Sequence, residues 1–131
     1  MSSDRPHVLV IPFGYPDYPQ DMLRQYADAS VHALAGLDLE VETTPMVIID
    51  RDVAAARKQA RESEADLIVL LVLSWIEVPL IPAVLQDVFG RPLLLWSHTT
   101  FREADGGEAD LGCVPGAAVV RQMLEEMKVP F

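Results

Sequence analysis

Three short segments concentrate the side chains of this sequence that could contact or transform a small molecule. They are residues 14–18 (GYPDY), residues 74–77 (SWIE) and residues 96–100 (WSHTT). Together they offer aromatic faces, hydroxyls, one imidazole and two carboxylates. This set suits a neutral polyol better than a phosphate, because aromatic rings cover C–H groups while the polar atoms bind hydroxyls.

Six of these side chains are the candidate substrate-binding residues: Tyr15, Asp17, Trp75, Glu77, His98 and Thr99. Several also have a purely structural interpretation. Trp75 can be core packing beside a strand, Asp17 can cap a helix, and Glu77 can favour the positive N-terminus of the helix that follows. His98 lies in a polar context after a strand, which makes it the best catalytic or ligand candidate among the three histidines.

The sequence lacks the motifs of several common types of functional site. No glycine-rich phosphate loop follows the first apolar segment, and the acidic residues of a phosphoacceptor domain are missing there. No histidine, cysteine and carboxylate cluster has metal-ligand spacing, and no Ser–His–Asp arrangement is evident. We therefore expect this chain to hold neither a catalytic metal nor the catalytic groups themselves.

The acidic composition restricts the partners. A net charge of −10 repels phosphate backbones and anionic lipids, so we expect neither a nucleic acid nor a membrane as partner. The lone cysteine, Cys113, excludes an internal disulfide and fits a reducing cytoplasm. It is interpreted as a small buried or loop residue.

The elements that must position the three segments alternate between strand and helix. The apolar run at 67–73 is long enough to be a central strand that is buried on both faces. Strands are predicted at 7–12, 39–43, 67–73 and 92–96, the second at a sheet edge and the last two buried. Helices are predicted from Asp17 to about Gly36, at 52–64 with Asp50 as its cap, at 78–89 and at 115–128. Residues 103–112 are predicted to be a solvated acidic loop.

This alternation predicts a single α/β domain over residues 1–131. The fold class is a doubly wound, flavodoxin-like or Rossmann-like three-layer parallel sheet. The expected strand order is 2-1-3-4, with residues 129–131 beginning a truncated fifth strand. In such a sheet ligands bind beyond the carboxyl ends of the strands where the strand order reverses, here between the first and third strands.

The chain resembles the N-terminal domain of the L-fucose isomerase and L-arabinose isomerase superfamily over essentially its whole length. Four ordered segments carry the resemblance: Gly14-Tyr15-Pro16 leading to Leu23-Arg24-Gln25, then 74–77, then 92–96 with Ser97-His98-Thr99, and finally 116–131. Trp75 matches a tryptophan that contacts the sugar. The first loop departs from the family pattern, because fucose isomerases place an arginine where this chain has Tyr15 and Asp17.

The resemblance implies the N-terminal domain of a longer, cytoplasmic, homo-oligomeric aldose–ketose isomerase that works at a divalent metal, usually Mn²⁺. The metal ligands and catalytic carboxylates of that family lie in later domains, so this domain would shape the sugar pocket and the subunit contacts. The alternative is a stand-alone flavodoxin-like module that binds a small molecule or a partner and has no catalytic activity.

Overall fold

The protein, described here from a computed structural model over residues 4–131, is built on a parallel sheet. Its strands are β1 (His7–Phe13), β2 (Glu40–Thr43), β3 (Leu67–Val72) and β4 (Leu93–Ser97). All pairings are parallel and the order is β2-β1-β3-β4, as the sequence predicts. β1 and β3 pair from Val8 opposite Leu67 to Phe13 opposite Val72. The two apolar strands therefore occupy the centre of the sheet.

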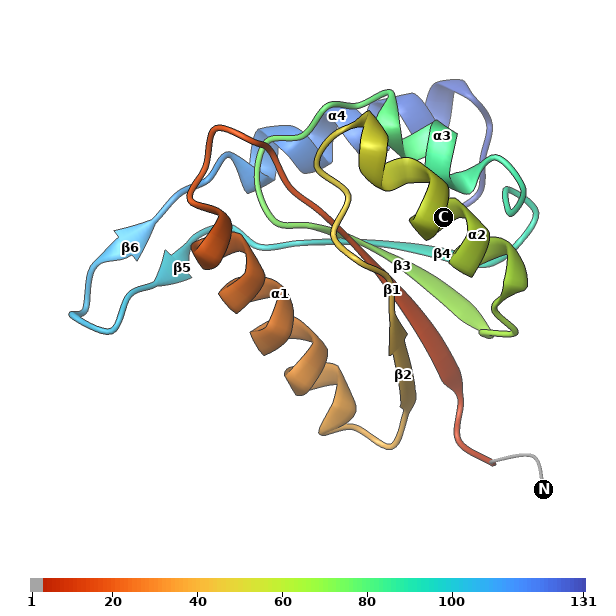
Figure 1. Ribbon diagram of the computed structural model, residues 1–131, viewed down its shortest axis with the longest axis horizontal. Helices are drawn as coiled ribbons and strands as arrows, with labels where there is room; N and C mark the ends of the chain where they lie inside the picture. The colour runs from red at the N-terminus through yellow and green to blue at the C-terminus, as the bar shows by residue number, and fades with distance from the viewer. Residues whose placement is uncertain (1–3) are drawn as a thin grey trace.

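Helices cover both faces of this sheet (Figure 1). One face packs against α1 (Gln20–Ala35), and the other packs against α2 (Val53–Glu62), α3 (Leu80–Leu85) and α4 (Cys113–Glu126). Alternate residues of β1 divide between the two cores, with Val10 facing α1 and Ile11 facing the other helices. The fold is thus a three-layer α/β structure of the flavodoxin-like or Rossmann-like type, which confirms the predicted fold class.

β4 is an edge strand, so the prediction that it is buried on both faces is wrong. Leu93 is buried on the α2–α4 side, but Leu94 is 48% exposed on the α1 side. The reason is positional, because α1 lies over β1 and β2 and leaves Leu94 uncovered. β2 lies at the opposite edge, as its alternating pattern predicts.

Two predicted helix caps are wrong. α1 starts at Gln20, and its N-cap residue is Pro19 with no side-chain cap. Asp17 is exposed, and the Gln20 amide instead donates to the carbonyls of Tyr15 and Tyr18 at 3.2 and 2.9 Å. Before α2, a 3₁₀ turn, η1 (Asp50–Asp52), uses Asp52 rather than Asp50: its carboxylate accepts from the Ile48 and Ile49 amides.

Two other helix boundaries also differ from the sequence prediction. α3 is much shorter than the predicted 78–89, because its C-terminal part continues as tight turns with bonds from Val88 to Leu85 and from Arg91 to Val88. α4 starts two residues earlier than predicted, at Cys113. Val120 and Leu124 are fully buried, whereas Met127 is 43% exposed at the end of the helix.

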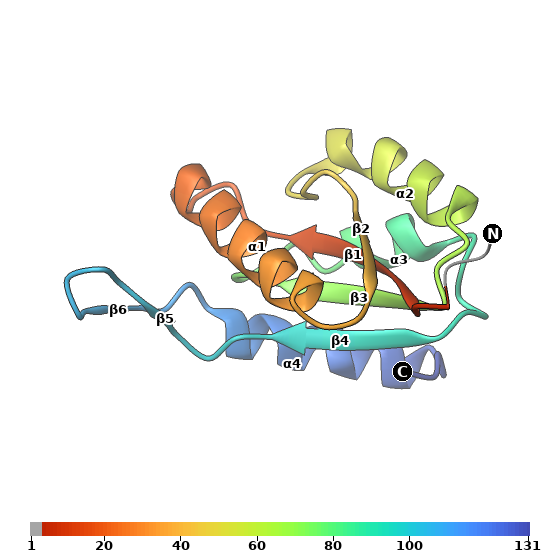
Figure 2. The same ribbon diagram turned by 90° about the horizontal axis from the view of Figure 1, so that it is seen from below.

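The segment predicted to be a solvated loop contains a hairpin. β5 (Phe101–Arg102) and β6 (Glu108–Ala109) pair antiparallel, with Gly106 at positive φ in the turn. The hairpin projects from the carboxyl edge of the sheet, away from the rest of the domain (Figure 2). Its base is anchored by Phe101 and Leu111, which are buried in the core on the α1 side.

Residues 129–131, predicted to begin a fifth strand, form no strand in this structure. They instead complete a C-terminal cap of α4. Lys128 adopts a left-handed conformation at φ 56°, and the Val129 amide donates to the Leu124 carbonyl at 2.9 Å. Val129 and Leu124 are both buried in the same core, which is the apolar contact typical of such a cap.

Candidate functional site

The candidate site lies beyond the carboxyl ends of β1 and β3. The chain leaves β1 toward β2 on one side and leaves β3 toward β4 on the other, so the strand order reverses between them. Side chains from the two loops can therefore meet without a strand crossing above them. Residues 14–19 after β1 and residues 73–79 after β3 form this switch point.

Tyr15, from the first loop, lies beside Glu77 from the second. The negative charge of Glu77, followed by that of Asp17, raises the pKa of the Tyr15 phenol above its usual value. The phenol is therefore protonated at neutral pH and can donate a hydrogen bond. The ring of Tyr18 lies edge-on to that of Tyr15, with 6.1 Å between the centroids. The structure thus brings three of the predicted site residues together: Tyr15, Asp17 and Glu77.

Trp75 is 37% exposed at this edge. Its backbone amide donates to the Leu111 carbonyl at 2.7 Å. Gly112, at φ +74°, fits between two aromatic residues: a Cβ there would lie 3.2 Å from the Tyr18 hydroxyl and 3.3 Å from the Trp75 Cβ. Trp75 and Tyr18 therefore flank the same glycine, and this close contact restrains the backbone and Cβ of Trp75.

Gly116 on α4 also positions Trp75. A Cβ at Gly116 would lie 2.7 Å from the Ser74 carbonyl oxygen and 3.4 Å from the Trp75 Cα. Only a glycine lets the first turn of α4 pass this close to the end of β3. The loop that carries Trp75 is thus held in place by close packing of its backbone against α4.

The Ser74 hydroxyl, noted in the sequence as part of the binding edge, is not available to a ligand. Ser74 is fully buried, and its hydroxyl donates to the Trp75 carbonyl at 2.6 Å. The polar groups at the edge include the Tyr15 phenol and the carboxylates of Asp17 and Glu77. A shallow pocket of 350 Å³ opens beside Glu77, lined also by Ile49, Asp50, Pro79 and Leu80.

His98 has a different set of neighbours. Its Nε2 lies 3.0 Å from the Ser30 hydroxyl on α1, and its ring contacts those of Trp96 and Phe101. The Ser30 hydroxyl donates its hydrogen to the Tyr26 carbonyl at 2.8 Å, so it must accept from His98 Nε2–H. Burial lowers the pKa of His98, which favours the neutral ring.

His98 therefore belongs to an aromatic cluster that fastens the hairpin to α1. In this cluster the rings of Tyr26 and Phe101 stack at 3.7 Å, and the Tyr26 hydroxyl donates to Glu103 at 3.2 Å. The described contacts of His98 run to this cluster rather than to Tyr15 or Trp75. Its neighbour Thr99 is exposed in a bend at the start of the hairpin.

Cys113 is buried, as predicted, and its thiol has low reactivity. Its thiol faces the Leu73 carbonyl at 3.1 Å, and burial raises its pKa to about 11. The thiolate, which is the reactive form, is therefore scarce at neutral pH.

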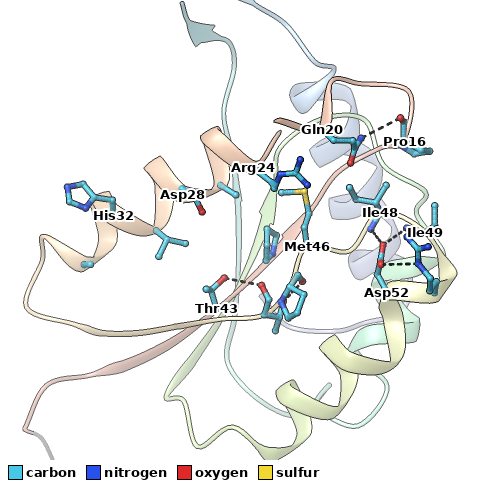
Figure 3. A pocket seen from close by; sticks show the side chains of 17 residues that line it. Pro16, Gln20, Arg24, Asp28, His32, Thr43, Met46, Ile48, Ile49 and Asp52 are labelled. Atoms are coloured by element: carbon cyan, nitrogen blue, oxygen red, sulfur yellow. Dashed lines mark hydrogen bonds and ion pairs between the residues drawn. The ribbon is translucent and has the colours of Figure 1, made fainter. Parts of the chain in front are cut away.

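The structure also contains a hollow that sequence reasoning missed. It is a groove of 860 Å³ between α1 and residues 43–52 (Figure 3). A signal existed in the sequence, because Gln20, Arg24, Asp28 and His32 recur every four residues and so line one flank of the helix. The wall opposite α1 is an apolar segment that follows an edge strand, and this segment carries no recognisable sequence motif.

Comparisons with protein families, with curated proteins and with solved structures give no match to this chain. Within residues 4–131, no group of three or more histidine, cysteine or carboxylate side chains is arranged to hold a metal ion. None of the helices in that range has both the length and the apolar character needed to cross a bilayer. The geometry of the sheet edge is therefore the basis for a functional proposal.

Proposed function

We propose that this chain is the sugar-contacting N-terminal domain of a fucose- or arabinose-type aldose–ketose isomerase. In this role the domain shapes the sugar pocket and the subunit contacts, and other domains supply the Mn²⁺ site and the proton transfers. The observation that carries the proposal is Trp75, which is 37% exposed at the switch point, in the same loop as Glu77, the neighbour of Tyr15.

The chemistry of this edge suits a sugar. An indole face covers the C–H groups of a sugar or of its open-chain form, and a phenol and a carboxylate can exchange hydrogen bonds with adjacent hydroxyls. Asp17 and Glu77 make the edge negative, which disfavours a phosphorylated ligand. The expected cofactor is a divalent cation bound outside this chain, and no step assigned to the domain depends on it.

Tryptophan fluorescence can test this proposal, because the chain has two tryptophans. In Trp96→Phe the remaining emission comes from Trp75, and in Trp75→Phe it comes from Trp96. Titration with L-fucitol or L-arabinitol, the open-chain alditols, should change the first signal with a Kd on the order of 1 mM or weaker. The second variant is the matched control. An unchanged Trp75 signal, or an equal response to glycerol, would contradict the proposal.

A stand-alone binding module is the second candidate, and the groove beside α1 favours it. Its 860 Å³ lies within the range of about 300–1,000 Å³ that small-molecule sites occupy. In that case Trp75 would be a packing residue, and neither alditol would change its emission.

A further inference from the structure

We infer that α1 and the groove beside it form a two-fold contact surface, whose partner is the same surface of a second copy of this chain. The groove has an apolar floor that includes Ala27, Val31, Met46 and Ile48. Its opposite wall includes Ile49, which is 38% exposed. A second copy would cover this apolar area.

Four polar residues line the α1 side of the groove at intervals of one helical turn: Gln20, Arg24, Asp28 and His32 (Figure 3). Apart from Gln20, whose N–H groups bind loop carbonyls, these side chains make few contacts within the chain. Arg24 pairs only with Asp21 on its own helix, where the two side chains are 65% and 96% exposed, so that pair stabilises little. Among the described residues, the Asp28 and His32 side chains have no hydrogen-bond or ion-pair partner.

This stripe is complementary to itself. Residues in an α-helix rise about 1.5 Å each, so two copies of α1 packed antiparallel about a two-fold axis level with Tyr26 place residue 24 opposite residue 28. Arg24 of each copy then faces Asp28 of the other. By the same geometry Gln20 faces His32, and the Gln20 amide oxygen is free to accept because its N–H groups bind loop carbonyls.

The charge balance of the groove favours a second copy over other partners. The chain carries a net charge of −10, so most of its surface repels another copy. The groove is an exception, because its lining combines Arg24 and Arg51 with Asp28 and Asp52. One helix and one loop from each copy give an interface at or below the low end of the usual range of about 1,200–2,000 Å², which predicts a weak, reversible dimer.

Sedimentation equilibrium of the full chain tests this inference, at concentrations from about 10 μM to about 1 mM where weak contacts populate. The wild type should dimerise. Arg24→Asp and Asp28→Arg should each lower the association constant by about tenfold or more, because each places like charges opposite one another. These substitutions change the net charge in opposite directions, so a common loss cannot come from general repulsion. The double variant Arg24→Asp, Asp28→Arg restores opposite charges and should dimerise again.

Arg121→Asp on α4 is the matched control, since Arg121 also pairs with a carboxylate on its own helix, Glu125, at 3.0 Å. This control should dimerise like the wild type, and circular dichroism should show every variant folded. The inference is overturned by a monomer at all concentrations or by a double variant that stays monomeric. It is also overturned if the α1 variants still dimerise while Leu94→Glu, on β4, dissociates the dimer.

Discussion

At the scale of single residues, exposure separates side chains that can reach a ligand from those that hold the fold. Trp75 and His98 follow neighbouring strands, and both are candidate substrate-binding residues in the sequence. In the structure the indole is partly exposed at the switch point, whereas the imidazole is held in a cluster with Ser30 and Phe101. Trp75 is thus the stronger ligand-contact candidate, and His98 has a clear structural role.

Substitution of Trp75 by alanine should cost less stability than the loss of a core aromatic residue. Removal of a fully buried tryptophan typically lowers the free energy of unfolding by about 3–5 kcal/mol. Because Trp75 is 37% exposed, we expect a loss of about 2–3 kcal/mol, in proportion to the smaller area that it buries. Urea denaturation measures the difference. A loss in the core range would mean that Trp75 mainly serves packing.

His98 should make stability depend on pH. Its pKa is lowered in the folded state by burial, so the unfolded chain binds the proton more readily. The stabilisation is therefore complete above the unfolded pKa of about 6.5 and is lost as the pH falls below it. His98→Gln keeps an N–H donor for Ser30 but does not titrate. Between pH 7.5 and pH 5.5, about one unit either side of that pKa, the wild type should lose more unfolding free energy than this variant. Parallel pH profiles for the two proteins would contradict the assignment.

At the scale of elements, the strands could be predicted from the sequence more accurately than the helix ends. The aliphatic run of β3 and the alternation in β2 determine which strand is central and which lies at the edge, and both were predicted correctly. Helix starts depend instead on which of several nearby polar groups accepts the first amides. Asp50 and Asp52 are equally good N-cap residue types, yet no side chain caps α2, and the Asp52 carboxylate instead binds the Ile48 and Ile49 amides that precede the helix.

The site was predictable only where it depends on strand order. Placing Tyr15 and Glu77 at one edge follows from the parallel sheet, and the structure brings the two side chains together. The burial of Ser74 and the docking of His98 on α1 depend on contacts with distant segments. In particular, the close approach of Gly116 to Ser74 joins residues 42 positions apart, and no local pattern reveals it.

Gly116→Ala should therefore disturb the candidate site. An added methyl group in a helix normally favours folding by about 1 kcal/mol. Here it would lie 2.7 Å from the Ser74 carbonyl oxygen, so α4 must move away from β3. We expect a net loss of about 1–3 kcal/mol in unfolding free energy. Gly90→Ala is the control, since a Cβ there meets nothing within 4 Å. Equal stability of the two variants would show that α4 adjusts without strain.

At the scale of the whole molecule, the proposed function assigns sugar contact to this domain and the metal site to other domains, and no three-ligand metal site lies within residues 4–131. We therefore expect the 131-residue chain alone to show no isomerase activity. Ketose formation from L-fucose or L-arabinose with added Mn²⁺ is the assay, and a chelator is the control. Chelator-sensitive turnover by the isolated chain would contradict the proposed division of roles between this domain and others.

Mapping of amide chemical shifts by NMR during titration of the wild-type chain with L-fucitol tests the central proposal most directly. It reports on the switch point and on the groove beside α1 in one experiment. We expect shifts at the Trp75 indole N–H and at the backbone amides of Tyr15 and Glu77, with the Trp96 indole unchanged. Shifts confined to Arg24, Asp28 and residues 43–52, or no shifts at all, would contradict a sugar-contacting edge between β1 and β3.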